Sequence, residues 1–384
     1  MNILHVISSL GKTQGGTSEV VPRMCEALVA GDASVRILTC EYGELSAAAI
    51  RAQKAGVDIR VYNRTGVGGK VLRYSAQMRS EIDEQVRWAD IVHLHGLWQW
   101  PCWMAGRAAW RNKKPYVMMP HGFLEPERLK ISKWKKRIVG RICERPLLSR
   151  ANGVVATSKS ELDGIRQYGV NRPSHIMPIG LDVNLYRHEE RGGVEECKTL
   201  LFFSRISPVK GLDMLADAWG RIQRDGVGAG WKLLIVGPDD RGHTDVIKQV
   251  YAEKCPSGTY EFRGPVYGDD KYQLLASVDA AVLPTRSENW SIAVAEAMAS
   301  ELPVVCTKGA PWECLNSAHA GWWVDISVEG VERGIRNLID LTDLQRQQMG
   351  CNGRRWVEEN LGWQHIAQEM VGFYTKILSR DRRS

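Results

Sequence analysis

Two glutamates, Glu288 and Glu296, are separated by seven residues in the segment that runs from Ser287 to Thr307. The segment opens with a polar loop, continues as an alanine-rich helix, breaks at Glu-Leu-Pro and ends in a Val-Val-Cys strand. Ser291 is a candidate N-cap residue, and we expect its hydroxyl to accept a hydrogen bond from an amide one turn further on. The unpaired amides and the positive dipole end of such a helix favour a bound anion.

The spacing of the two carboxylates predicts an elongated ligand. Glu296 lies five residues beyond Ser291, which is roughly 7–8 Å along a helix that rises about 1.5 Å per residue. This is the reach from a diphosphate to its attached ribose, and Glu288 would lie on the opposite side of the anion. A sugar, a diphosphate, a ribose and a base would fit this order. The spacing alone is equally typical of a capped surface helix with two solvated glutamates.

Two cations and a pair of glycines are further candidates for binding phosphate. Arg205 and Lys210 follow an expected strand and precede a helix, and open α/β sheets bind ligands at this end of their strands. They could neutralise a diphosphate or simply be surface charges. Gly15 and Gly16 follow the first strand, where glycines let backbone amides approach an anion closely. The G-x-G-x-x-G fingerprint is absent, and a flexible turn remains an alternative for this loop.

Histidines follow two neighbouring strands of the first half. His93 and His95 stand in the sequence HLHGLWQW, with no carboxylate close enough in sequence to complete a metal site, so we expect no metal. The tryptophans of this stretch suit either stacking against sugars or packing in the core. His121 precedes Gly122 at the end of the next strand. A lone histidine is more often structural, but its position at a strand end makes it a candidate site residue.

The order of these motifs resembles family 4 of the retaining glycosyltransferases. The Gly-Gly loop, His-Gly at His121, R-x4-K-G at Arg205 and Lys210, G-P-V and E-x7-E occur in that order over nearly the whole chain. Each motif is weak alone, and the series is specific. Typical members read E-G-F-G after the first glutamate, whereas this chain has a loop without glycine, Asn289-Trp290-Ser291.

The resemblance implies a role for each matching residue. It assigns Glu288, His121, Arg205 and Lys210 to catalysis, with His121 contacting the donor sugar. The positions that it assigns to donor binding are Gly15, Gly16, Arg205, Lys210, Gly264, Val266, Glu288, Asn289, Trp290, Ser291 and Glu296, with Gly264 and Val266 in the turn that binds the base. It implies no metal and no cofactor besides the donor substrate.

The elements that must position these residues are repeated β-α units. Most expected strands are continuous apolar runs, as in a parallel sheet covered on both faces. The expected strands are residues 3–7, 35–39, 59–62, 91–94, 116–119, 154–156, 175–177, 200–203, 233–236, 260–266, 280–284, 304–306 and 322–324. The resemblance implies the α/β GT-B fold, with two Rossmann-like doubly wound domains facing across a cleft.

Three segments follow from this pattern. We expect an acceptor-binding domain over residues 1–182, a nucleotide-sugar-binding domain over residues 183–362, and a helix over residues 363–384 that crosses back to the first domain. The helix has Ile366, Met370, Phe373 and Ile377 on one stripe. A polar run over residues 187–198 reads as the linker.

Composition favours a globular protein of a reducing compartment. Apolar residues make up 44% and charged residues 25% of the chain, and no run approaches the length of a membrane span. The amino-terminal residues read as a strand rather than a signal peptide. Nine scattered cysteines without a C-x-x-C pair indicate free thiols rather than a zinc site. We therefore expect a cytoplasmic protein.

A basic segment between Arg128 and Arg150 has the pattern of an amphipathic helix. Nine cations face one acid there, and Ile131, Trp134, Ile138 and Ile142 recur at helical spacing. Such a helix can lie on the inner face of the cytoplasmic membrane or pack on its own domain as an ordinary surface helix. The nine cations are Arg128, Lys130, Lys133, Lys135, Lys136, Arg137, Arg141, Arg145 and Arg150.

Together with the resemblance, these observations predict a retaining hexosyltransferase that needs no metal, with a UDP- or GDP-linked sugar as donor. The resemblance implies that the leaving phosphate takes the acceptor's proton. The stretch from His121 through residue 158 looks most like bacterial enzymes of O-antigen, lipopolysaccharide and exopolysaccharide biosynthesis, which implies an undecaprenyl-diphosphate-linked saccharide as acceptor. A sugar-nucleotide epimerase or hydrolase of the same fold is the alternative. Nucleic-acid binding by the basic segment is a third possibility, against which the ordered anion-site motifs argue.

Overall fold

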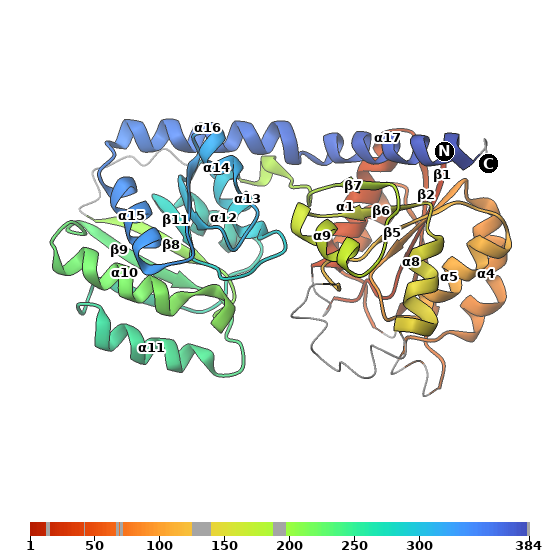
Figure 1. Ribbon diagram of the computed structural model, residues 1–384, viewed down its shortest axis with the longest axis horizontal. Coiled ribbons are helices and arrows are strands. Elements are labelled where there is room, and N and C mark those ends of the chain that lie inside the picture. The colour runs from red at the N-terminus through yellow and green to blue at the C-terminus, as the bar shows by residue number, and fades with distance from the viewer. Residues whose placement is uncertain are drawn as a thin grey trace. The chain divides into compact units, whose positions relative to one another are not determined.

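The chain folds into two compact units in a computed structural model that describes residues 1–12, 16–41, 43–66, 69, 72–124, 140–186 and 197–381. Unit 1 comprises Met1–Gly180 together with Trp363–Ser384, and unit 2 comprises Leu181–Gly362. Figure 1 shows that each unit is built from a sheet with helices around it.

Unit 1 contains a seven-stranded parallel sheet in the order β3-β2-β1-β4-β5-β6-β7. Its strands are β1 (Asn2–Ile7), β2 (Ser34–Glu41), β3 (Asp58–Asn63), β4 (Ile91–His95), β5 (Tyr116–Met119), β6 (Gly153–Ala156) and β7 (Ser174–Ile176). Its helices are α1 (Thr17–Ala30), α2 (Ala47–Lys54), α4 (Ala76–Trp88), α5 (Trp100–Arg111), the π-helical turn Gly140–Glu144, α8 (Arg145–Arg150), α9 (Lys159–Gln167) and α17 (Trp363–Asp381).

Unit 2 contains a six-stranded parallel sheet in the order β10-β9-β8-β11-β12-β13. Its strands are β8 (Lys198–Phe203), β9 (Trp231–Val236), β10 (Tyr260–Arg263), β11 (Ala280–Leu283), β12 (Val304–Thr307) and β13 (Gly321–Val324). Its helices are α10 (Leu212–Arg224), α11 (His243–Lys254), α12 (Asp269–Ala276), α13 (Ile292–Ala299), α14 (Cys314–Ser317), α15 (Val328–Ile339) and α16 (Asp343–Leu361), with 3₁₀ turns at Val183–Leu185 and Pro208–Lys210.

Each sheet carries one apolar core on either face. In unit 1 the side chains of α4 and α5 pack on one face, and those of α1 and α17 pack on the other. In unit 2 the two cores contain residues of α13 and α16 and residues of α10 and α15. Because both faces are covered, the central strands are mostly apolar and largely buried, which is the pattern read from the sequence; the buried histidines of β1 and β4 are exceptions. The predicted fold class is confirmed.

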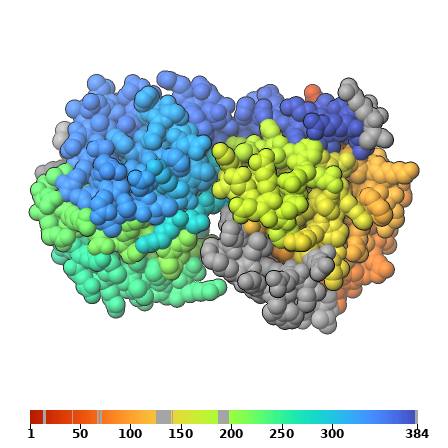
Figure 2. Space-filling model, viewed as in Figure 1, coloured from red at the N-terminus to blue at the C-terminus, as the bar shows by residue number. Residues whose placement is uncertain are grey.

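Helix α17 is separated in sequence from the rest of unit 1 by the whole of unit 2. It lies against α1, and its outward side remains on the surface of unit 1 (Figures 1 and 2). All four residues of the predicted stripe, Ile366, Met370, Phe373 and Ile377, are buried in the core beneath it. The amphipathic pattern of this segment therefore identified its packing face correctly.

Some expectations need correction. The strand expected over residues 260–266 ends at Arg263, so Gly264 and Val266 lie in the loop after β10. Lys198, expected at the end of a linker, begins β8, while residues 187–196 lie outside the described part of the chain. Most of the basic segment, residues 125–139, also lies outside it. Among the described helices, none combines the length and the apolar character needed to cross a lipid bilayer.

Candidate functional site

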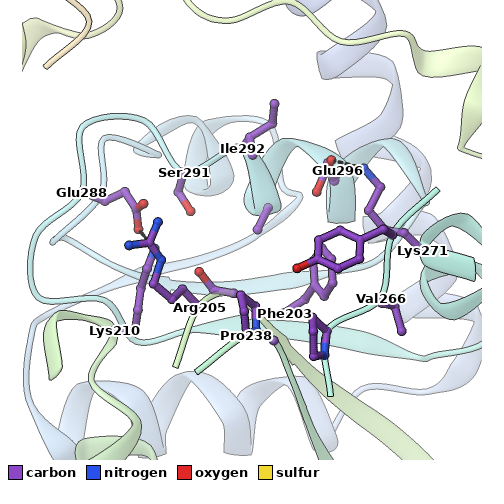
Figure 3. A pocket seen from close by; sticks show the side chains of 15 residues that line it. Phe203, Arg205, Lys210, Pro238, Val266, Lys271, Glu288, Ser291, Ile292 and Glu296 are labelled. Atoms are coloured by element: carbon purple, nitrogen blue, oxygen red, sulfur yellow. Dashed lines mark hydrogen bonds and ion pairs between the residues drawn. The ribbon is translucent and has the colours of Figure 1, made fainter. Parts of the chain in front are cut away.

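A cavity of about 280 Å³ opens at the carboxyl end of the sheet of unit 2. Six of the predicted site residues line it: Arg205, Lys210, Val266, Glu288, Ser291 and Glu296. In Figure 3, Arg205, Lys210 and Glu288 lie together at one end, and Glu296 lies at the other. Phe203, Pro238 and Val266 form part of its wall. The cavity therefore carries both charges and apolar surface, as an elongated nucleotide ligand requires.

Lys210 and Glu288 form an ion pair at the charged end of the cavity. The loop that carries Glu288 is held to the turn that carries Lys210, because the Arg286 amide donates to the Val209 carbonyl at 2.8 Å. The amide of Glu288 in turn donates to the Gly309 carbonyl at 2.7 Å. Two loops that are distant in sequence thus bring a cation and a carboxylate to one place.

Steric crowding explains why the predicted R-x4-K-G motif ends in glycine. Gly211 has a φ of 68° and is the N-cap residue just before α10. A Cβ atom at this position would lie 2.1 Å from the backbone carbonyl oxygen of Pro284, just after β11. Only glycine combines the left-handed conformation with this close approach, so the motif also fixes where Lys210 meets the loop of Glu288.

Glu296 is buried at the other end of the cavity, and its carboxylate already has two partners. The Tyr186 hydroxyl donates to Glu296 Oε1 at 2.9 Å, and Lys271 Nζ lies 2.7 Å from the same oxygen. The ammonium of Lys271 also lies 5.1 Å from the centre of the Tyr272 ring. Lys271 compensates the charge of a carboxylate that burial would otherwise destabilise.

The expected role of Ser291 as a side-chain cap is wrong. Ser291 does occupy the N-cap position of α13, but its φ of 57° and ψ of 83° are left-handed, and its side chain makes no cap hydrogen bond. A capping serine normally has an extended backbone, which turns its hydroxyl toward the amides of the first turn. The hydroxyl of Ser291 instead lies at the cavity wall.

The remaining predicted residues of unit 2 lie outside the cavity wall. Gly264, Asn289 and Trp290 are not among the residues that line it. The ring of Trp290 packs against Trp312, with 4.6 Å between ring centroids, and its carbonyl accepts a hydrogen bond from the Trp312 indole at 2.5 Å. Trp290 is therefore a partly buried residue that packs against the core of unit 2 and anchors the loop of Glu288.

In unit 1, Gly15 lies outside the described residues, and Gly16 immediately precedes α1. Gly16 has a φ of −50°, and a Cβ atom there would meet no atom of the described residues within 4 Å. The described residues therefore impose no steric need for glycine at this position.

His121 lies just beyond β5 in a strained conformation, with a φ of 56°. Left-handed backbone is costly for a residue other than glycine and is typical of functional sites. Burial lowers the pKa of His121 to about 4, although the nearby Glu161 carboxylate acts in the opposite direction. His121 is therefore neutral at pH 7. Its Nε2 lies 3.0 Å from Nδ1 of His95, which leaves Nδ1 for other partners.

Sequence reasoning missed the residues that complete the wall of the cavity. Lys271 and Tyr186 were missed because each is an isolated polar residue whose partner, Glu296, is at least 25 positions away. Phe203 and Pro238 stand at the ends of recognised strands, so a systematic inspection of strand ends could have found them. No local signal pointed to Lys271.

Comparison with known proteins identifies the class. Residues 14–185 match the family described as Glycosyltransferase Family 4, and residues 197–340 match the family described as Glycosyl transferases group 1. These two matches extend over most of the chain. The chain belongs to the family 4 glycosyltransferases, and the resemblance read from the sequence motifs is confirmed.

Individual relatives are more distant. The chain is 27% identical over 341 residues to the GDP-mannose:cellobiosyl-diphosphopolyprenol alpha-mannosyltransferase of Xanthomonas oryzae pv. oryzae, covering 86% of this chain and 85% of that protein. It is 26% identical over 282 residues to the MMP alpha-(1->4)-mannosyltransferase of Mycolicibacterium hassiacum, covering 71% of this chain and 61% of that protein. The fold is similar to that of Anabaena HepE in complex with UDP and glucose, with a TM-score of 0.73, 19% identity and coverage of 98% and 100%.

Proposed function

We propose that this glycosyltransferase moves a hexose from a UDP- or GDP-linked donor to a hydroxyl of a saccharide, with retention at the anomeric carbon. The observation that carries the proposal is the cavity of unit 2, which joins Arg205, Lys210 and Glu288 at one end to the buried Glu296 at the other. The diphosphate would lie at Arg205 and Lys210, the ribose would contact Glu296, and the base would pack against the apolar wall.

In this reaction the bond between the anomeric carbon and the diphosphate oxygen breaks, and a bond to the acceptor oxygen forms on the same face of the sugar. The charge that develops on the leaving phosphate is stabilised by Arg205, Lys210 and the first amides of α13. The leaving phosphate takes the proton of the acceptor hydroxyl. Because cationic side chains and amides supply this stabilisation, the proposed reaction requires no metal.

In this proposal Glu288 both binds the donor sugar and orients Lys210. Its carboxylate can accept hydrogen bonds from sugar hydroxyls, and its pairing with Lys210 holds the ammonium toward the cavity. Donor phosphate would then share Lys210 with Glu288. The loop of Trp290, anchored in the core, keeps this carboxylate in place.

We further propose a lipid-linked acceptor, such as a saccharide on undecaprenyl diphosphate, used in O-antigen or exopolysaccharide synthesis. Support comes from the Xanthomonas relative, whose name specifies a diphosphopolyprenol acceptor. The docking surface on unit 1 that we propose for the membrane includes the basic segment between Arg128 and Arg150. A surface cavity of about 270 Å³ lies beside the described part of this segment, and residues that line it include Arg107, Trp110, Ile142 and Arg150. Trp110 is 60% and Ile142 62% exposed.

The proposal is tested with a panel of UDP- and GDP-linked hexoses. The matching donor should raise the melting temperature, since a ligand at about 100 times its Kd stabilises by roughly 2.7 kcal/mol. Each stabilising donor is then incubated with and without a polyprenyl-diphosphate saccharide. A new glycosidic bond with the donor's anomeric configuration is the expected product. An epimerised or hydrolysed donor, formed equally well without acceptor, would contradict the transferase proposal.

A further inference from the structure

Three histidines form a hydrogen-bonded series that ends at His121. His5 lies on β1 and His95 on the neighbouring β4, with His5 Nδ1 2.9 Å from His95 Nε2. The other nitrogen of His95, Nδ1, lies 3.0 Å from Nε2 of His121. His5 and His95 are 0% and 2% exposed. Two fully buried imidazoles thus stand behind a residue predicted to contact the donor sugar.

Burial keeps all three imidazoles neutral. It lowers the pKa of His5 to about 3 and that of His121 to about 4, and it lowers the pKa of His95 well below its usual value. A neutral imidazole has one N–H and one acceptor nitrogen. The series can therefore run in only two directions, since each hydrogen bond needs one donor and one acceptor.

The two directions differ at the far end, at His5 Nε2. This nitrogen is buried and has no hydrogen-bond partner among the described residues. In one direction His121 donates to His95 and His95 donates to His5, so the remaining proton of His5 is on Nε2, as a buried N–H without an acceptor. In the other direction His5 donates to His95 and His95 donates to His121, so His5 Nε2 is an acceptor without a donor. Buried N–H groups without partners are the rarer and costlier case, so the second direction is favoured.

We infer that His95 and His5 are positioning residues that hold His121 in the neutral tautomer with its proton on Nδ1. In this arrangement His5 donates to His95, His95 donates to Nε2 of His121, and Nδ1 of His121 remains a hydrogen-bond donor. The catalytic consequence rests on the proposed function: His121 would donate to a sugar hydroxyl and could not act as a base through Nδ1. The tautomer itself does not depend on that function.

His93 provides a matched control. It lies on β4 two residues before His95, and the centroids of these two rings are 4.2 Å apart. Its Nδ1 lies 2.6 Å from the Tyr374 hydroxyl of α17, and its Nε2 has no hydrogen-bond partner among the described residues. His93 is as deeply buried as His95, but it does not take part in the series.

The direct test is nuclear magnetic resonance of the whole chain labelled with ¹⁵N in histidine. At pH 7 the long-range ¹H–¹⁵N correlations of His121 and His95, assigned with the variants below, should show protonated Nδ1 and unprotonated Nε2. Protonated Nε2 on His121, or a charged His121, would overturn the inference. So would one equivalent of a transition metal in the purified protein, because ligand atoms of His5, His93 and His95 all lie within 4.8 Å of one another.

Variants connect the tautomer to catalysis. His95→Phe keeps a ring but cannot donate to His121, and we expect kcat to fall about tenfold with the donor KM unchanged. His95→Asn retains a donor near the position of Nδ1 and should restore kcat to within threefold of the wild type. His93→Phe should lower the melting temperature while the tautomer of His121 and kcat stay as they are. A wild-type kcat in His95→Phe would refute the role in catalysis.

These results also separate the inference from the proposed function. If the tautomer is as stated but no sugar is transferred from any donor, only the proposed function fails. If sugar is transferred and His121 carries its proton on Nε2, only the inference fails.

Discussion

At the scale of single residues, two cations that line the cavity are already paired with its two glutamates. Lys210 is paired with Glu288, and Lys271 with Glu296. Both pairs are largely buried, and buried pairs contribute little net stability, whereas the loss of one partner is costly. Substitution of either glutamate therefore has two effects, one on ligand contacts and one on the cation left behind.

The two glutamates should respond differently to the loss of charge. Glu288→Gln removes the carboxylate at the reacting end, and we expect kcat to fall by about 10²–10³, comparable to the loss of one donor that stabilises a transition state. Glu296→Gln should chiefly weaken donor binding, by roughly tenfold, which is the usual size for one hydrogen bond to a charged group. Steady-state kinetics and donor titration measure the two effects.

Tyr186→Phe is the control for Glu296, because it removes one hydrogen bond to Oε1 while the carboxylate and Lys271 remain. We expect it to change donor affinity by less than Glu296→Gln does. Wild-type kinetics in both glutamine variants would show that the E-x7-E assignment is wrong.

At the scale of elements, helix α17 closes one face of unit 1. Phe373 is buried at 6% exposure, and its ring would lie 2.8 Å from a Cβ atom placed on Gly153 of β6. The helix thus packs directly on the backbone of the strand. Phe373→Ala should destabilise unit 1 by about 3–5 kcal/mol, the usual cost of a large cavity in a core.

Hydrogen exchange distinguishes a loss of stability confined to unit 1 from one that affects both units. Amides of β4 and β6 should exchange faster in Phe373→Ala, while those of β8 and β11 in unit 2 keep their protection. Glu369→Ala, a change of a partly exposed residue on the same helix, is the control and should have little effect. Equal losses in both units would contradict the prediction.

The buried histidines of β1 and β4 make the stability of unit 1 depend on pH. Burial lowers the pKa values of His5, His93, His95 and His121 below the usual 6.5. Below pH 6.5 the unfolded chain therefore binds more protons than the folded one, and folding stability falls as the pH falls. Each histidine contributes about 1 kcal/mol per pH unit.

One carboxyl acts in the opposite direction. Burial raises the pKa of Glu144 to about 7, so its contribution to stability declines as the pH rises from about 4.5 to 7. Four histidines outweigh one carboxyl, and the free energy of unfolding should fall from pH 7 to pH 5.5. Denaturant titration at each pH measures how steeply the free energy of unfolding depends on pH. His5→Gln should reduce this slope by about 1 kcal/mol per pH unit, the contribution of one histidine. A slope of zero would contradict the neutral state of these imidazoles.

The strands and helices were largely predictable from the sequence, whereas the pairings between side chains in the cavity were not. Each of the thirteen expected strands has a counterpart among the thirteen strands of the described residues, because most strands of a parallel sheet covered on both faces are continuous apolar runs. Lys271 leaves no such signal, since its role depends on a helix packing beside Glu296. The side-chain cap of Ser291 failed for a similar reason: a backbone in the left-handed region is set by the surrounding loop and not by the residue itself.

At the scale of the whole molecule, the chemistry needs no metal if the cations and helix amides act as proposed. Transfer should therefore proceed at the same rate after treatment with EDTA, and the product should keep the donor's anomeric configuration. Product analysis by nuclear magnetic resonance measures both. A strict requirement for Mg²⁺ or Mn²⁺ would count against the mechanism.

The proposed docking surface on unit 1 predicts binding to anionic membranes. Each Lys or Arg near such a surface adds about 1 kcal/mol, and exposed Trp110 and Ile142 add apolar contact. The protein should float with liposomes that contain anionic lipid and should bind less as salt is raised. Changing Lys133, Lys135, Lys136 and Arg137 to Glu, or Trp110 to Ala, should reduce flotation while hydrolysis of soluble donor persists.

Leu344→Ala is the matched control for this experiment, because Leu344 is 75% exposed but lies on α16 of unit 2. It should float like the wild type. If neither the wild type nor the control floats, or if all variants float equally, the basic segment is an ordinary surface element.

The division of unit 1 along the chain has a consequence for how the protein is made. A ribosome completes β1 to β7 first, then unit 2, and only afterwards α17. At about 5–20 residues per second, the 182 residues of Leu181–Gly362 take roughly 10–40 s. During that interval the first sheet has α1 on this face but lacks α17, which completes the covering and supplies Tyr374, the partner of His93. Nascent unit 1 should therefore be the species that chaperones bind, whereas unit 2, which is continuous, can fold as it emerges.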